Sequence, residues 1–453
     1  MNKSLPLLLL IAGCSFIPPY ERPTAPVPEQ WPAPGAVSPA PSFNGDWRAY
    51  FTDPALQRLI EQALEHNRDL MIAVARVAEA RALAGLARGD RFPSVDVGVQ
   101  AQAARVPGSL TTSGRPVINR RLDANLAVTA FELDFWGRVA SLETAARANF
   151  FASEFAQRAF RLSLISEVAS AYYGLAELSE RTALAEAVLR SRAESHRLIA
   201  KRREVGLASD LDFYAAKGAY QAALAELSNL ARQKAAAENA LQLLTGQQGA
   251  VLPAPTFGML PDFAVGLPSE VLLSRPDVLA AEQKLIAANA NVGAARAAFL
   301  PRIALTVAAG SASPALAGLF ASGSGAWSFV PVLKMPLFDA GRSEANVDLA
   351  EVRKNIAVAE YEKTIQQAFR EVADLLAARE HLDRQLAALV AVEAAQAERL
   401  SRVEARHRHG VANYLELLDA QREHFAAQQA VIAARRALAV NAAGLFKATA
   451  GGE

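Results

Sequence analysis

An internal duplication with equal spacing constrains the fold of this chain more than any other feature of its sequence. The segment FWGRVASLETA recurs as DAGRSEANVDL, and REVGLASDLDFYAAK recurs as RHRHGVANYLELLDAQ. The glycines in these matches are evenly placed: Gly206 follows Gly137 by 69 positions, and Gly410 follows Gly341 by 69 positions. Such equality requires an element of the same fixed length in each copy. The chain therefore folds as two similar repeats.

The first repeat is placed at residues 47–250 and the second at 251–453. Each contains two short segments in which apolar and polar residues alternate, a period of two that is typical of β-strands. These segments predict strand hairpins at about 94–133 and about 302–334. Residues 303–333 carry no charge, but two prolines and several glycines argue against a membrane-spanning helix there.

Long helices follow the strands in both repeats. Between the paired glycines lie about 64 residues rich in Ala, Leu, Glu and Arg, without proline, which predicts one helix on the order of 95 Å long. Each such helix ends at a glycine suited to the left-handed C′ position. A second helix then begins at a capping box, formed by Ser209 with Asp212 and by Asn413 with Glu416. Each repeat is thus a strand hairpin joined to a long antiparallel helical hairpin.

The number of strands limits the assemblies that such a chain can form. Strands of this length and period match those of outer-membrane barrels. Four strands cannot close, and an open edge in lipid leaves backbone groups unpaired. Two chains would give eight strands around a filled interior, whereas three give twelve strands with room for water. We predict an α+β membrane protein: a trimeric 12-stranded outer-membrane β-barrel with four strands per chain, continued by a long periplasmic α-helical barrel, with an internal two-fold repeat.

The N-terminus predicts a lipid anchor. Cys14 is the only cysteine, and the apolar run before it is too short to span a bilayer and is typical of a signal peptide. The tetrapeptide IAGC resembles the bacterial lipoprotein box, which implies cleavage before Cys14 and its acylation, for instance with palmitate. We predict a signal peptide at 1–13 and a lipid anchor with a proline-rich extended segment at 14–46. The alternative is a buried cysteine, but removal of a signal peptide would leave Cys14 at a terminus or remove it.

Composition and motifs exclude several classes of function. The 47 basic and 46 acidic residues are nearly balanced, so no nucleic-acid partner is indicated. A single cysteine excludes a disulfide framework and any cysteine-based metal cluster. The sequence has no HExxH, Walker, GxSxG or GxGxxG motif, so we predict no enzyme and no cofactor. His407 and His409 lack a third ligand nearby in sequence, so we expect exposed loop residues rather than a metal site.

Several separate motifs resemble one family in the same order along the chain. GLPSEVLLSRPDVLAAEQKL, AARAAFLPRIALT, PLFDAGR and HGVANYLELLDAQR are similar to signatures of the TolC-like outer-membrane factors, in their NodT lipoprotein branch. The resemblance extends from Trp47 to about Lys447. It implies a homotrimeric, lipid-anchored outer-membrane channel with a periplasmic extension. This channel would be the passive exit duct of a tripartite efflux pump, driven by an inner-membrane transporter through a periplasmic adaptor (membrane fusion protein). The resemblance does not indicate which cargo the channel exports, for example antibiotics or metal ions.

The resemblance also implies a gate at the periplasmic mouth. Its constricting apolar residue corresponds to Leu415, its carboxylate to Asp419 and the ion-pairing arginine to Arg422. These positions lie at i, i+4 and i+7, on one face of a helix. Three such carboxylates around an axis would favour cations and could be locked by salt bridges. His407 stands where the family usually has an aromatic residue, and Ala215 occupies the first-repeat position of Asp419, so only the second repeat should carry the gate. The alternative is a solvated i, i+3 pair without function.

Two other classes of function fit the sequence less well. A periplasmic adaptor is also lipidated and also has long helical hairpins. Adaptors carry one hairpin inserted into small β-domains, whereas this chain alternates two hairpins with two strand pairs. An outer-membrane lipoprotein enzyme would need a catalytic constellation, and none is found in the sequence.

Overall fold

The computed structural model describes residues 15–28, 46–249, 252–258 and 269–449. Cys14, the predicted signal peptide and most of the proline-rich segment lie outside these residues. The chain divides into two compact units, and each takes segments from both sequence repeats. Unit 1 comprises Met1–Thr24, Arg76–Glu154 and Ala280–Glu362. Unit 2 comprises Ala25–Ala75, Phe155–Leu279 and Lys363–Glu453.

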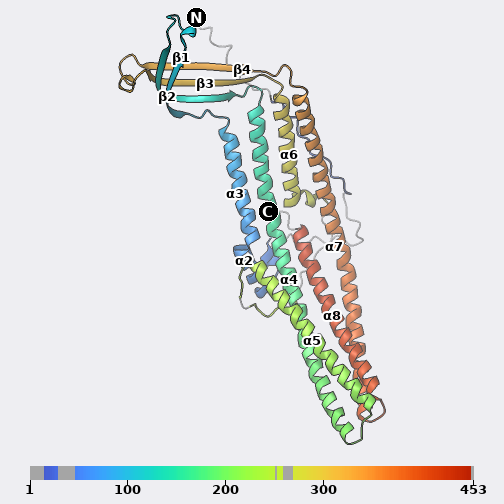
Figure 1. The fold of residues 1–453 in the computed structure, drawn as a ribbon. Coiled ribbons are helices and arrows are strands. Elements are labelled where there is room, and N and C mark those ends of the chain that lie inside the picture. Colours follow the sequence, from blue (N-terminus) through green and yellow to red (C-terminus); the bar gives the residue numbers. More distant parts are fainter. Residues whose placement is uncertain (1–14, 29–45, 250–251, 259–268, 450–453) are drawn as a thin grey trace. The chain divides into compact units, whose positions relative to one another are not determined.

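Unit 1 contains one antiparallel sheet with the strand order β1-β2-β3-β4 (Figure 1). The strands are β1 (Asp96–Val106), β2 (Val117–Leu133), β3 (Arg302–Ser313) and β4 (Gly325–Lys334). The central pairing, β2 with β3, joins the two sequence repeats, and its register shifts between Val128 and Phe131. Such a bulge bends a strand and increases its twist, which suits a curved barrel wall.

The sheet is suited to contact lipid and other chains. Large apolar side chains such as Val97, Val99, Trp327 and Phe329 are exposed on its strands. An apolar outer face is what a barrel wall presents to lipid. In the described residues β1 pairs only with β2 and β4 only with β3, so each has an edge that another chain can complete.

The helices repeat in length as the glycine spacing predicts. Helices α4 and α7 have 67 residues each, and α5 and α8 have 36 each. The bounds are α1 (Trp47–Tyr50), α2 (Pro54–His66), α3 (Arg68–Gly89), α4 (Arg138–Glu204), α5 (Asp210–Thr245), α6 (Pro276–Ala297), α7 (Arg342–Arg408) and α8 (Tyr414–Thr449). Short 3₁₀ turns lie at η2 (Gly108–Leu110), η3 (Ser269–Ser274) and η4 (Leu316–Gly318). Within the described residues, no helix combines the length and the apolar character that crossing a bilayer requires.

The turns between paired helices follow from their glycines. Gly206 and Gly410 have φ angles of +77° and +76°, which residues with a side chain rarely adopt. The amide of Leu207 donates to the Arg202 carbonyl at 2.7 Å, and that of Val411 donates to the Arg406 carbonyl at 2.9 Å. Both are Schellman C-caps, in which orphan carbonyls at the helix end are satisfied. The two hairpins therefore turn in the same way.

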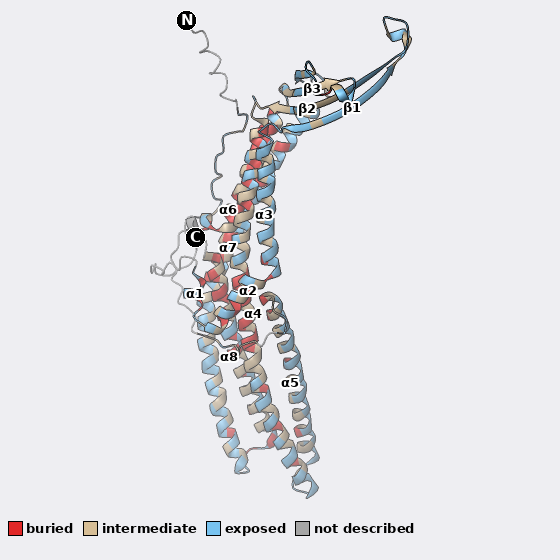
Figure 2. Ribbon diagram, turned by 90° about the vertical axis from the view of Figure 1, so that its left-hand side faces the viewer, coloured by how far each residue is buried: buried red, intermediate tan, exposed pale blue. Residues whose placement is uncertain are grey.

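The core of unit 2 lies where α1 and α2 meet α4, α5 and α8. Its buried side chains include Tyr50, Ile60, Tyr172, Leu241 and Phe446. Figure 2 shows buried residues among these helices, whereas α5 consists mostly of exposed and intermediate residues. The Asp53 carboxylate caps the first turn of α2 and accepts a hydrogen bond from Tyr172 at 2.6 Å. Burial and this contact raise the pKa of Tyr172 to about 12.

In unit 1 the N-terminal segment 15–24, here called the strap, lies along α6. Arg22 donates two hydrogen bonds of 2.7 Å to the Glu282 carboxylate, and Tyr20 donates a third at 2.9 Å. The Glu282 side chain is only 7% exposed. A Cβ atom at Gly293 would come within 2.7 Å of Ile17, so glycine allows the strap to approach the helix closely. The strap is thus fixed to α6 by an ion pair in which the carboxylate is nearly buried and the Arg22 side chain is half exposed.

Replacing Glu282 with alanine should release the strap, because Arg22 and Tyr20 would lose the carboxylate that accepts hydrogen bonds from both. We expect chymotrypsin to cleave after Tyr20 at least several times faster in this variant, measured by N-terminal sequencing of the digested protein. The control is Glu351→Ala, which removes a surface ion pair with Arg296 in the same unit, leaves the sequence around Tyr20 intact and should not change the cleavage rate. Equal rates for Glu282→Ala and the wild type would contradict this role.

Candidate functional site

The hairpin between α7 and α8 contains the residues singled out from the sequence. It turns at Gly410, and α8 then starts after Asn413, whose side-chain oxygen accepts from the Glu416 amide at 2.8 Å. Tyr414 is buried and packs with Ile199 of α4 and Ala216 of α5. The tip of this hairpin therefore rests against the α4–α5 hairpin within unit 2.

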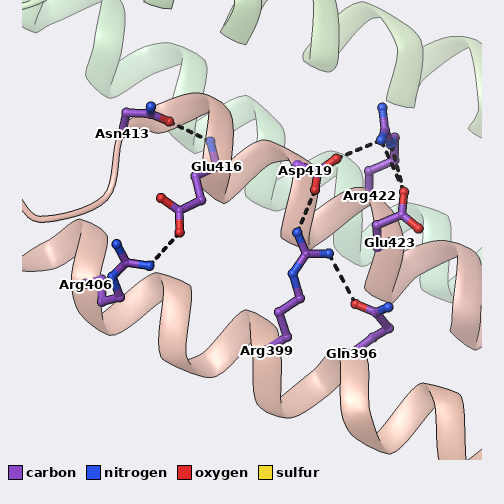
Figure 3. Close-up of polar contacts among 8 residues, drawn as sticks. All are labelled: Gln396, Arg399, Arg406, Asn413, Glu416, Asp419, Arg422 and Glu423. Atoms are coloured by element: carbon purple, nitrogen blue, oxygen red, sulfur yellow. Dashed lines mark hydrogen bonds and ion pairs between the residues drawn. The ribbon is translucent and has the colours of Figure 1, made fainter.

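Asp419 is held by two arginines from different helices (Figure 3). Its Oδ1 atom accepts from Arg422 of α8 at 2.7 Å, and its Oδ2 atom accepts from Arg399 of α7 at 2.7 Å. Asp419 and Arg422 thus meet, as their i, i+3 spacing allows. Leu415 is 70% exposed and lines the same groove as these two residues.

Arg399 was missed in the sequence, although a signal for it exists. In an antiparallel hairpin, positions at similar distances from the turn lie opposite each other. Arg399 precedes Gly410 by 11 positions and Asp419 follows it by 9. The same logic places Arg406 opposite Glu416, and these form a second ion pair across the hairpin at 2.7 Å. Charge complementarity about the turn could therefore have identified both contacts.

These contacts compensate the negative charge that Asp419 would present if its carboxylate had no ion-pair partner. Arg422 also contacts Glu423 at 3.1 Å, so Arg399, Asp419, Arg422 and Glu423 form one network with no net charge. In this conformation the carboxylate charge of Asp419 is compensated. The cation preference expected of three such carboxylates applies only when these ion pairs are broken.

A groove of about 750 Å³ separates the start of α8 from α4 and α5. Arg192 of α4 lines it, is buried, and donates to the side-chain oxygen of Gln421 at 2.6 Å. Burial lowers the pKa of the Arg192 guanidinium from its ordinary value. Arg192 therefore links the two hairpins beside the Asp419 network, and nothing in the local sequence pattern distinguishes it from other helix arginines.

The histidines at the tip show no arrangement for a metal. The Nδ1 atom of His407 lies 3.0 Å from the Ala412 carbonyl oxygen, and its ring is 6.1 Å from that of Tyr414. Among the described residues, no group of three or more His, Cys, Asp or Glu side chains could hold a metal ion. His407 instead packs within the turn, at the position where an aromatic residue was expected.

The first repeat lacks the charged network. A shift of 204 positions superimposes Gly206 on Gly410, and it aligns Ser195, Ala215 and Gly218 with Arg399, Asp419 and Arg422. All three first-repeat residues are uncharged. The two hairpins share a turn geometry but differ at these positions.

Comparisons with known proteins agree with the fold. The family model described as "Outer membrane efflux protein" matches residues 59–247 and 267–451. The outer membrane protein OprJ of Pseudomonas aeruginosa is 42% identical over 99% of this chain and 95% of its own length. The solvent efflux pump outer membrane protein SrpC of Pseudomonas putida is also 42% identical, over 99% of this chain and 98% of its own.

Solved structures give the same result. A membrane protein from Pseudomonas aeruginosa is 42% identical and superimposes with a TM-score of 0.91 over 96% of this chain and all of that chain. The open state of the MtrE outer membrane channel of Neisseria gonorrhoeae is 37% identical, with a TM-score of 0.86 over 97% of this chain and 98% of that one. The predicted fold class and function are confirmed, and the adaptor alternative is excluded. The chain is an outer-membrane efflux channel protein and belongs to the outer membrane efflux protein family.

Proposed function

We propose that this chain is one third of a passive exit duct whose periplasmic end is gated by the α7–α8 hairpin. Three chains complete a barrel of twelve strands, since the edges of β1 and β4 need partners. An inner-membrane transporter supplies the energy and a periplasmic adaptor connects it to the duct. The chain itself performs no catalysis, which is supported by the lack of catalytic motifs in its sequence.

The observation that carries the gate proposal is the position of Asp419 between two helices. An i, i+3 pair within α8 alone would only stabilise that helix. The contact with Arg399 instead ties α8 to α7, at positions where the first repeat has the uncharged residues Ser195, Ala215 and Gly218. Leu415 would narrow the opening as an exposed apolar side chain on the same helix face.

The N-terminal lipid anchor at Cys14 remains part of this proposal. After cleavage of the signal peptide 1–13, the acylated cysteine would begin the anchor and proline-rich segment 14–46. The fixed strap supports this arrangement, because it holds the chain directly after Cys14 against α6. Relatives are named for efflux of toluene and of antibiotics, which favours small organic molecules as cargo.

Replacing Asp419 with alanine should raise the resting conductance of the channel in planar lipid bilayers, because both ion pairs of the gate are lost. Arg422→Ala should raise it less, since the Arg399 contact remains. The control is Glu380→Ala, which removes an exposed i, i+4 pair with Arg384 within α7. Unchanged conductance in both gate variants would remove these residues from the gate.

A further inference from the structure

A second groove, of about 520 Å³, lies in unit 1 between α4, α6 and α7. These helices run side by side in Figure 1, and residues of all three line the groove. Four basic residues line the groove, and no carboxylate is among the described residues that line it. The basic residues are Arg138, Lys284, Arg302 and Arg353.

Nearby carboxylates do not neutralise all of these cations. Glu132 forms a two-pronged ion pair with Arg138, at 2.8 and 2.6 Å, and also acts electrostatically on Arg302. Asp134 caps the α4 N-terminus, and Glu351 of α7 pairs with Arg296. Among the described residues, Lys284 and Arg353 have no carboxylate within salt-bridge distance, and both are exposed. The groove therefore carries uncompensated positive charge.

The rest of the lining is amphipathic. Three amide side chains, Asn149, Asn291 and Asn346, add hydrogen-bond donors beside the cations. The remaining surface consists of alanines of α6 and α7 with Leu142 and Leu349. Such a surface fits a ligand that has an apolar body and one anionic group.

The groove and the strap use opposite faces of α6. The strap contacts Glu282, Asn289 and Gly293, spaced at i, i+7 and i+11. Lys284, Asn291 and Ala295 line the groove with the same spacing, two positions further on. Two positions correspond to about 200° around a helix. This step rests on the proposed function: the strap leads to a lipid anchor outside the duct, so the opposite face of α6 faces the interior.

We propose that this groove is a transit site for amphiphilic organic anions inside the duct. A carboxylate, phosphate or sulfonate group binds between Lys284 and Arg353, and the apolar body packs on the alanines and leucines. Three copies in the trimer would raise the local concentration of such cargo, and weak, solvated contacts would still allow it to leave.

The test uses a pair of dyes that differ only in charge. 1-Anilinonaphthalene-8-sulfonate carries a sulfonate, and N-phenyl-1-naphthylamine is the same apolar body without it. Each is titrated fluorimetrically into the full chain in an uncharged detergent. In the variant Lys284→Gln with Arg353→Gln, sulfonate binding should weaken by about tenfold, and binding of the uncharged dye should not change. The control variant Arg76→Gln with Arg88→Gln removes two exposed cations of α3 outside this groove and should bind both dyes normally.

Three results would overturn the proposal. The first is equal affinity of the sulfonate dye for the wild type and the groove variant. The second is equal loss of both dyes, which would indicate a purely apolar site or a damaged fold. The third is loss of co-purified lipid phosphorus in the groove variant without any change in dye affinity, which would assign the cations to a lipid headgroup. Dye binding is measured without a bilayer and does not depend on the conductance of the channel. A negative titration therefore does not contradict the gate proposal, and unchanged conductance in the gate variants does not contradict this proposal.

Discussion

Replacing Asp419 with arginine is expected to raise the resting conductance about tenfold or more, the largest effect on transport that we predict for a single substitution. The substitution removes two attractive contacts of 2.7 Å and places a third guanidinium between Arg399 and Arg422. Exposed ion pairs contribute only about 0.2 to 1 kcal/mol each. A trimer would contain three of the Arg399–Asp419 pairs that join α7 to α8, and together they contribute about 0.6 to 3 kcal/mol. A tenfold change in the closed-to-open ratio needs about 1.4 kcal/mol, which lies within this range before the added repulsion is counted.

The measurement is single-channel recording in planar bilayers at low and high salt. Screening weakens exposed ion pairs, so wild-type conductance should rise more steeply with ionic strength than that of the variant. Glu380→Arg, on the exposed surface of α7, reverses a charge in the same helix that carries Arg399 and should leave the gate shut. A variant as closed as the wild type would show that these pairs do not hold the gate.

The largest expected loss of stability comes from Arg275→Ala in unit 2. The Arg275 side chain is 5% exposed and contacts Asp277 at 2.8 Å and Glu371 at 2.9 Å. It also donates to the carbonyl of Ala448 near the end of α8, at 3.2 Å. Breaking a fully buried ion pair costs about 3 to 5 kcal/mol. Because both carboxylates are about a third exposed, we expect a loss of about 2 to 4 kcal/mol in the free energy of unfolding.

This loss is measured by urea unfolding of the detergent-solubilised protein, followed by tryptophan fluorescence. Arg370→Ala is a matched control, since Arg370 is 82% exposed and forms an exposed i, i+4 pair with Asp374, and it should change stability by about 0.5 kcal/mol or less. Arg275→Lys keeps the charge but cannot bridge both carboxylates, so its stability should lie between those of Arg275→Ala and Arg370→Ala. Stability equal to the Arg370 control would contradict the role of Arg275.

The same site predicts a dependence on pH. Burial alone would raise the pKa of Glu371, but hydrogen bonds from Arg275 and Lys447 outweigh it and hold that pKa below its ordinary value of 4.5. A carboxylate with a lowered pKa in the folded state stabilises the protein fully above its unfolded pKa. That contribution disappears as the pH falls from about 4.5 through the folded value. Arg275→Ala should therefore be less sensitive to acid over this range than the wild type.

Local patterns were sufficient for much of the fold. The glycines at 206 and 410 fix where α4 and α7 end, because only a residue without a side chain adopts their backbone angles easily. Alternation of apolar and polar residues located all four strands, since each strand faces two different environments. The i, i+3 spacing of Asp419 and Arg422 likewise determined their contact on α8.

Contacts between distant segments could not be predicted in the same way. Arg22 and Glu282 are 260 positions apart, and neither periodicity nor capping relates them. Arg275 and Lys447 both pair with Glu371, and these three residues are also far apart in the sequence. The register shift in β2 depends on its pairing with β3 from the other repeat. These features depend on tertiary packing, which a single sequence specifies only through the complete fold.

The most direct test of the gate is to exchange its charges across the hairpin. The double variant Arg399→Asp with Asp419→Arg keeps the net charge of the network and restores an attractive pair between α7 and α8. Its resting conductance is predicted to return most of the way from the value of Asp419→Arg alone to that of the wild type. A double variant that conducts as much as Asp419→Arg alone, although it is trimeric and folded, would contradict the claim that an ion pair between these two helices closes the duct.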